Sequence, residues 1–215
     1  MTRQIAKAEP GATVTGIDLR KQYLDFARRK ADSENLTNVT FKEGDVQALP
    51  FAEASFDIVW HKYLLQWVAD PEAAMREFAR VTKPGGLIVC CNFDGFGITH
   101  EPPDPAMQPL AEHVFKQLVD PYIGRRLARM SQQAGLIDIK VAIEADNVFT
   151  VVGQINAERR TNWETQWKAA REQTIKHLGS AALADAFIDS FLRYQDREDT
   201  ASYCTLFIVS GCKPA

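Results

Sequence analysis

The sequence predicts an α/β fold in which a doubly wound, mainly parallel sheet is covered by helices. Apolar strand-like runs alternate with helical patterns through residues 12–93, in the order strand, helix, strand, strand, helix, strand. This alternation is typical of parallel sheets whose strands are connected through helices. The run at 87–93 is apolar almost throughout, as expected for a strand covered on both faces. Two later strand patterns, at 137–143 and 202–212, predict an antiparallel hairpin at the edge of the sheet.

The first half of the chain supplies most of the predicted sheet. Residues 12–18 are rich in β-branched residues and end in Asp18, which predicts a buried strand. Helical spacing of apolar residues follows over about 20–33. The other elements expected here are a strand from Val39 to Gly44-Asp45, a loop at 49–51, a strand over 56–60 that runs into His61, a helix that starts after Asp70 with Pro71 at its first position and ends at 83–86, and the strand over 87–93.

The second half is predicted to be mainly helical. A loop with four prolines spans residues 95–109 and separates this half from the predicted sheet. Helical patterns follow at about 110–119, 122–134, 154–178 and 181–194. A chain of 215 residues has the size of one domain with a sizeable core, so we expect a single domain over residues 1–215.

Composition argues against several classes of function. The formal net charge of −3 gives no basic footprint for nucleic acid. No apolar run approaches the roughly 20 residues that span a bilayer, and the stretch before Pro10 lacks the apolar core of a signal peptide. The four cysteines have neither metal-ligand nor redox spacing. We therefore expect a cytoplasmic protein with reduced, buried cysteines, no bound metal, and neither a nucleic-acid nor a membrane partner.

Asp18 is the first candidate functional residue. It stands at the carboxyl end of a predicted strand, just before a helix, where open α/β folds hold the ribose of a nucleotide. A carboxylate accepts hydrogen bonds from both hydroxyls of a cis-diol, so its chemistry suits that task. The alternative is that Asp18 only caps the following helix.

Six stretches together resemble the class I S-adenosylmethionine-dependent methyltransferases, in the small-molecule branch that includes ubiquinone- and menaquinone-biosynthesis-type enzymes. They are Val14 to Leu19, Ala27-Arg28, Phe41 to Val46, Leu49-Pro50-Phe51, Ser55 to Val59, and Glu77 to Gly86. Their order and spacing carry the resemblance. It implies a Rossmann-like fold and methyl transfer from S-adenosylmethionine to a small-molecule acceptor, with S-adenosylhomocysteine as product.

The resemblance also assigns cofactor-binding roles by position. Asp18 would accept the ribose hydroxyls, and Leu19 would pack near the adenine. Asp45 would accept from the adenine amino group, beside the backbone of Val46. His61 and Lys62 would lie near the methionine part of the cofactor.

The acceptor side is less defined. His61 is the candidate general base, because an unperturbed imidazole titrates near pH 6.5, and a structural or cofactor-contact role is the alternative. Tyr63, Trp67, Trp163 and Trp167 are candidates for an apolar acceptor pocket. Trp163 and Trp167 are four residues apart on a predicted helix, so plain core packing is an alternative for them. By resemblance, helical insertions at about 100–200 would cover the substrate.

One feature of the family is missing from the sequence. No glycine-rich loop precedes Asp18, and the resemblance places a first strand between the strands that end at Asp18 and at His61. Without that strand two inner sheet edges would be unpaired. The chain is then a fragment, or is completed by a second copy or a partner chain, or has rearranged and no longer methylates. A non-catalytic, methyltransferase-like subunit that acts through a partner chain is the alternative function. A nicotinamide dehydrogenase is disfavoured because it also needs the glycine loop.

Overall fold

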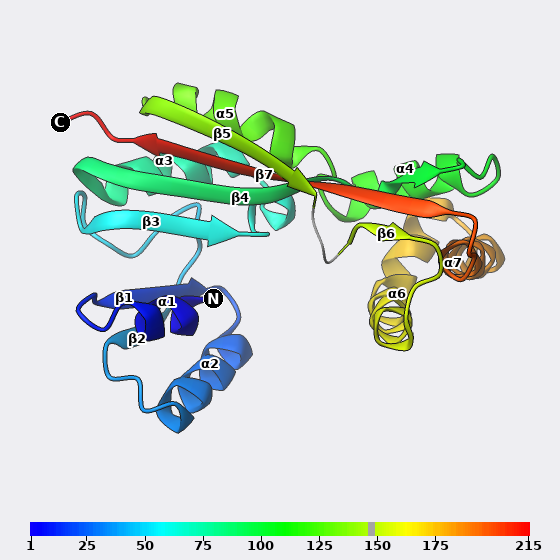
Figure 1. The fold of residues 1–215 in the computed structure, drawn as a ribbon, viewed down its shortest axis with the longest axis horizontal. Coiled ribbons are helices and arrows are strands. Elements are labelled where there is room, and N and C mark those ends of the chain that lie inside the picture. The colour runs from blue at the N-terminus through cyan, green and yellow to red at the C-terminus, as the bar shows by residue number, and fades with distance from the viewer. Residues whose placement is uncertain (146–148) are drawn as a thin grey trace.

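The computed structural model, which describes residues 1–145 and 149–215, has a Rossmann-like α/β fold (Figure 1). The order of strands and helices agrees with the predicted order through most of the chain. The elements are α1 (Thr2–Ala8), β1 (Val14–Asp18), α2 (Lys21–Ser33), β2 (Val39–Glu43), β3 (Phe56–Lys62), the 3₁₀ turn η1 (Leu65–Trp67), α3 (Pro71–Val81), β4 (Thr82–Glu101), α4 (Gln108–Leu118), α5 (Ile123–Gln133), β5 (Ile137–Ala145), β6 (Val151–Val152), α6 (Ala157–Leu178), α7 (Ala181–Gln195) and β7 (Ala201–Cys212).

The N-terminal unit is a small parallel sheet flanked by α1 and α2. Strands β1 and β2 pair in register from Val14 opposite Val39 to Asp18 opposite Glu43. The side chain of Asn38 donates to the carbonyls of Ala6, Glu9 and Ala12, which ties the end of α1 to the start of β1. This unit therefore fixes the carboxyl ends of β1 and β2 beside each other.

The larger sheet has the order β3-β4-β7-β5, with β6 paired to β7. Strands β3 and β4 are parallel, whereas β7 runs antiparallel to both β4 and β5. The expected antiparallel pairing of the last two long strands is confirmed. The pair lies at the edge of the sheet as expected, with β5 outermost and β7 between β4 and β5.

Strand β4 is longer than the sequence predicted. The expected turn at 83–86 and the first part of the expected loop at 95–109 belong to it. The reason is tertiary: β7 pairs antiparallel with β4 from Leu87 to Glu101, with a register shift between Asp94 and Thr99, and the backbone of Lys213 just after β7 bonds to Gly85 and Gly86. Gly95 and Gly97, both at positive φ, absorb that shift. Figure 1 shows the resulting β4–β7 ribbon reaching out to α4, α6 and α7.

Among the described residues, no strand pairing joins the two sheets. Strands β1 and β3 run in the same direction and face each other with unpaired edges (Figure 1). A cavity of about 370 Å³ lies between them, which we call the inter-sheet slot. Its walls include Gly16 and Ile17 of β1 and Ile58 and Trp60 of β3. The side chain of Ile58 is 61% exposed, which is unusual for an apolar residue in the middle of a sheet.

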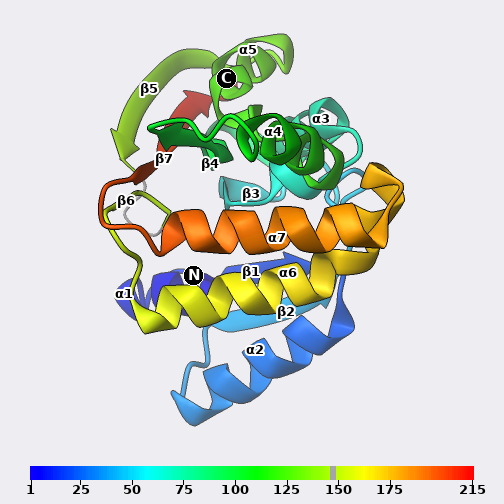
Figure 2. The ribbon, with the colours of Figure 1, turned by 90° about the vertical axis from the view of Figure 1, so that its right-hand side faces the viewer.

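Two apolar clusters hold the rest of the molecule together. One packs α3 and α5 against β4 and β7, and includes Met75, Phe78 and Leu127. The other lies under the helices of the second half and includes Phe93 and Phe191. Figure 2 shows α6 and α7 side by side in front of the sheets, in the region where a cover was expected. Within the described residues, none of the helices combines the length and the apolar character needed to cross a membrane.

Candidate functional site

The predicted nucleoside residues surround one hollow. A cavity of about 740 Å³, which we call the acidic hollow, is lined by Asp18, Leu19, Asp45 and Val46. The backbone N–H of Gly44 donates to the Asp18 carbonyl at 3.2 Å, so the turn after β2 lies against the end of β1. Two carboxylates thus meet at the carboxyl ends of neighbouring parallel strands, where open α/β sheets bind ligands.

The Asp18 carboxylate is only partly used within the protein. Its Oδ1 accepts from the backbone N–H of Arg20 at 2.8 Å. Arg20 is itself the N-cap residue of α2, and no side chain caps that helix. This hydrogen bond holds the Asp18 carboxylate at the turn between β1 and α2. It does not cap the backbone N–H groups in the first turn of α2. Its Oδ2 accepts no hydrogen bond from the described residues and is available to a ligand.

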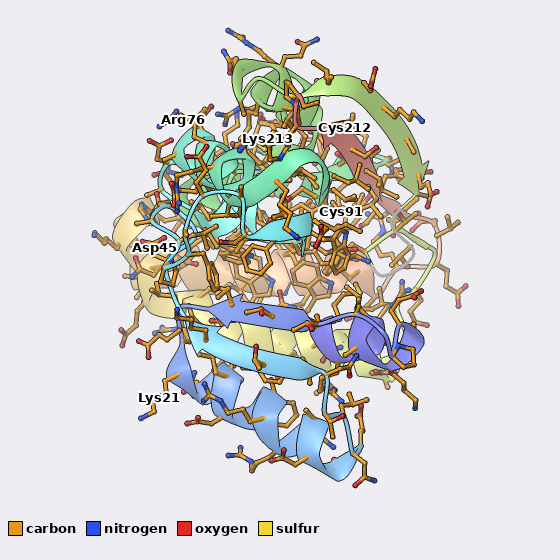
Figure 3. The ribbon with its side chains drawn as sticks, turned by 90° about the vertical axis from the view of Figure 1, so that its left-hand side faces the viewer. Lys21, Asp45, Arg76, Cys91, Cys212 and Lys213 are labelled. Carbon is orange, nitrogen blue, oxygen red and sulfur yellow. The ribbon has the colours of Figure 1, made fainter. Side chains whose placement is uncertain are left out.

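Asp45 is positioned by a chain of hydrogen bonds that leads to the start of α3. Its Oδ1 accepts from the backbone N–H of Gln47 at 2.8 Å, and the Gln47 side chain accepts from the backbone N–H of Asp70. Asp70 caps α3 as predicted, accepting from the Ala73 N–H at 2.8 Å. Figure 3 shows Asp45 on the connection between the two sheets. The start of α3 therefore sets the place of Asp45.

The loop at 49–51 is held by two side chains of α3. Arg80 donates to the carbonyls of Leu49 and Phe51, and Glu77 accepts from the Leu49 N–H at 2.7 Å. Arg80 and Glu77 also bond to each other, and this pairing lowers the pKa of the Glu77 carboxyl. This network fastens the N-terminal unit to the larger sheet, next to the acidic hollow.

His61 lines the inter-sheet slot rather than the acidic hollow. It is buried, its ring lies 5.3 Å from the Phe78 ring, and neither ring nitrogen has a hydrogen-bond partner in the described structure. Burial lowers the pKa of the imidazole to about 3. The ring is therefore neutral at pH 7 and binds a proton only weakly.

The end of β3 links the slot to the hollow. The ammonium group of Lys62, which lines the slot, lies 4.6 Å from the centre of the Tyr63 ring. Tyr63 lines both cavities and has a φ of 55°, a left-handed conformation that a tyrosine seldom adopts. Its backbone N–H donates to the Cys91 carbonyl at 2.9 Å, which holds it there. Backbone strain of this kind is often found at functional sites.

Three of the four predicted pocket residues line a separate cavity of about 450 Å³, which we call the aromatic cavity. They are Trp67, Trp163 and Trp167, whereas Tyr63 lies outside it. Trp167 is also part of the apolar core, and the Trp163 and Trp167 rings are stacked with centres 6.4 Å apart. Core packing and cavity lining are therefore compatible for Trp167.

Sequence reasoning missed three residues of these cavities. Phe96 and Phe115 line the aromatic cavity, and Arg20 lines both that cavity and the acidic hollow. The position of Arg20, two residues after Asp18, could have indicated from the sequence that its side chain lines the site. Nothing local indicated Phe96 and Phe115, which are brought together by the long β4 and by α4.

The described part of the chain holds no group of three or more His, Cys, Asp or Glu residues placed to bind a metal. None of the four cysteines forms a disulfide bond in the described part of the chain. Cys90, Cys91 and Cys204 are buried as expected, whereas Cys212 is only half-buried.

Comparisons with known proteins agree with this geometry. Residues 1–90 match the family model described as "Methyltransferase domain". An uncharacterized 37.1 kDa protein of a Streptomyces fradiae transposon is 33% identical, over 82% of this chain and 53% of that protein. The demethylmenaquinone methyltransferase of Halalkalibacterium halodurans is 32% identical, over 61% of this chain and 60% of the enzyme. The chain spans about half the length of the curated relatives it matches.

A solved structure has the same fold. It is Haemonchus contortus phosphoethanolamine N-methyltransferase 2 in complex with phosphomonomethylethanolamine and S-adenosylhomocysteine. The TM-score is 0.60 at 19% identity, and the match covers 99% of this chain and 46% of that one. The likeness confirms the predicted Rossmann-like architecture.

Proposed function

We propose that the chain is a class I S-adenosylmethionine-dependent methyltransferase of the small-molecule type, and that it takes part in methyl transfer from S-adenosylmethionine to a small organic acceptor. The observation that carries the proposal is the shared hollow of Asp18 and Asp45. The relatives named for demethylmenaquinone methylation support a small-molecule acceptor.

The donor set of the acidic hollow fits the nucleoside part of the cofactor. Asp18 has a free oxygen for the ribose hydroxyls, and Asp45 is held at the next strand end for the adenine amino group. Leu19, 65% exposed at the wall, offers an apolar surface for the adenine beside Val46. Lys62 offers a cation to the carboxylate of the methionine part. All these roles are proposals that rest on position and chemistry.

The cofactor, when bound, supplies a methyl group on a sulfonium, which is already an activated donor. The work of the chain is then to align the acceptor and to exclude water. We assign alignment to the walls of the aromatic cavity and exclusion of water to α6 and α7. His61 is proposed as a neutral residue near the methionine part, because a pKa near 3 makes it a weak general base at pH 7.

The comparisons favour the enzyme over a non-catalytic subunit. We nevertheless propose that the inter-sheet slot takes a strand from a second copy or a partner chain. Both walls offer unpaired backbone N–H and C=O groups in the same direction, which an extended strand satisfies. We further propose one domain over residues 1–215 and the cytoplasm as the compartment, in keeping with described cysteines that form no disulfide bond.

Isothermal titration with S-adenosylmethionine tests the cofactor site. We expect micromolar binding by the wild-type chain and a loss of about 100-fold in Asp18→Ala, since two hydrogen bonds to a charged group are removed. Asp25→Ala is the matched control, because Asp25 is a partly exposed acid of α2 whose described ion pair is with Arg28. Equal affinities in wild type and Asp18→Ala would exclude the nucleoside assignment, and no heat from the wild type would count against an active enzyme.

Size-exclusion chromatography with light scattering tests the strand proposal. An assembly whose cofactor affinity falls as it is diluted into monomers would support completion of the sheet by another chain. A monomer that binds S-adenosylmethionine with full affinity would contradict it.

A further inference from the structure

The aromatic cavity has a distinct chemical character. Its walls come from α4, α6 and β4, and they present the rings of Phe96, Phe115, Trp163 and Trp167. The Phe96 and Trp163 rings are stacked at 5.7 Å, and Phe115 meets Trp167 edge to face at 5.5 Å. A volume of about 450 Å³ lies within the range of cavities that hold drug-sized ligands. Walls of this kind favour flat, conjugated rings, which stack on aromatic side chains.

The polar groups of the cavity point to an anion. Among the described residues that line it, Arg20 is the one with a charged side chain, and Gln166 and Gln173 add neutral amides. The guanidinium donates to the Tyr23 hydroxyl at 3.2 Å and forms no ion pair with any described carboxylate. In addition, the indole N–H of the buried Trp167 has no hydrogen-bond partner in the described structure. A buried donor without a partner is rare in native proteins.

The cavity also lies next to the proposed cofactor site. Arg20 and Trp67 line both the aromatic cavity and the acidic hollow. A ligand with its rings in the aromatic cavity and its charge at Arg20 therefore has that charge at the boundary between the two spaces.

We propose that the aromatic cavity binds a flat aryl compound that carries an anionic oxygen, with the rings against Trp163 and Phe115 and the oxygen at Arg20. As a methyl acceptor, a role that rests on the proposed function, such an oxygen supplies the electron pair of the new O–CH₃ bond. The S–CH₃ bond breaks and its electron pair stays on sulfur, so the sulfonium becomes a neutral thioether. No proton is released, and no general base is needed.

Isothermal titration of the full chain without cofactor tests the proposal with three probes. They are 2-naphthoate, its neutral isostere 2-naphthamide, and octanoate, which has the charge without the rings. We expect 2-naphthoate to bind about tenfold more tightly than either of the others, because a charged hydrogen bond and ring stacking each add of the order of one tenfold step. Arg20→Gln is expected to lower the affinity for 2-naphthoate to that for 2-naphthamide, while Arg20→Lys keeps part of the difference.

Three results would overturn the inference: equal affinities for 2-naphthoate and 2-naphthamide, equal affinities for 2-naphthoate and octanoate, or the same loss for both naphthyl probes in Arg20→Gln. Trp163→Leu, which keeps Arg20, is expected to weaken both naphthyl probes and to leave octanoate within about twofold. Because no cofactor is present, selective binding of 2-naphthoate stands even if S-adenosylmethionine fails to bind. The failure of one proposal is thus distinct from the failure of the other.

Discussion

Replacement of His61 by leucine should change how stability depends on pH. In the folded protein burial lowers the pKa of this imidazole from 6.5 to about 3, whereas in the unfolded chain it titrates near 6.5. Between these values the unfolded state binds one proton more than the folded state. The free energy of unfolding therefore falls as the pH drops from 6.5 toward 3, by about 1.4 kcal/mol per pH unit. At pH 5.0 the accumulated loss due to His61 is about 2 kcal/mol relative to pH 7.5.

Urea unfolding followed by circular dichroism at pH 7.5 and pH 5.0 measures this change in the free energy of unfolding. From pH 7.5 to pH 5.0 we expect the free energy of unfolding to fall by about 2 kcal/mol more in wild type than in His61→Leu. The other buried histidine, His100, is present in both proteins, so its effect on the pH dependence of stability cancels in the comparison. Acids with lowered pKa values, such as Glu77, stay ionised at pH 5.0. His113→Leu, which replaces an exposed histidine, is the matched control and should follow wild type.

An equal loss in wild type and His61→Leu would refute the reasoning. It would mean that water or a proton acceptor reaches the ring in the folded protein, and that His61 is able to act as a base near neutral pH.

Two further substitutions test the framework of the site by urea unfolding. Arg80→Met should lower the free energy of unfolding by about 2 kcal/mol, because it removes two hydrogen bonds to carbonyls of the 49–51 loop and the ion pair with Glu77. Arg76→Met, on the exposed side of the same helix (Figure 3), should lower it by under about 0.5 kcal/mol. Equal costs would show that the loop is held by other contacts. Gly97→Ala should lower the free energy of unfolding by more than about 2 kcal/mol, because the added methyl group would overlap a buried phenylalanine ring. Gly85→Ala is also at positive φ but in open space, and should lower it by about 1 kcal/mol. Similar losses for both glycines would refute the steric argument.

Local patterns were sufficient where the physical cause is local. The helix that starts at Pro71 was predictable because Asp70 caps it and proline suits its first position, and both are visible in a few residues. The strand that ends at Asp18 and the helix after it were predictable for the same reason. Since parallel strands end at the same edge of a sheet, the meeting of Asp18 and Asp45 also followed from the order of the elements.

The sequence by itself determined the alternation of strands and helices, the two acids at strand ends and the resemblance to a methyltransferase family. Only the tertiary structure decided the place of β7 between β4 and β5, the length of β4, the burial of His61 and the joining of Phe96 and Phe115 to the tryptophans of α6. These features depend on which segments pair across more than 100 residues of chain, for example Cys90 with Val209. Long-range pairing, burial and cavity shape are properties of several segments together, so no single stretch encodes them.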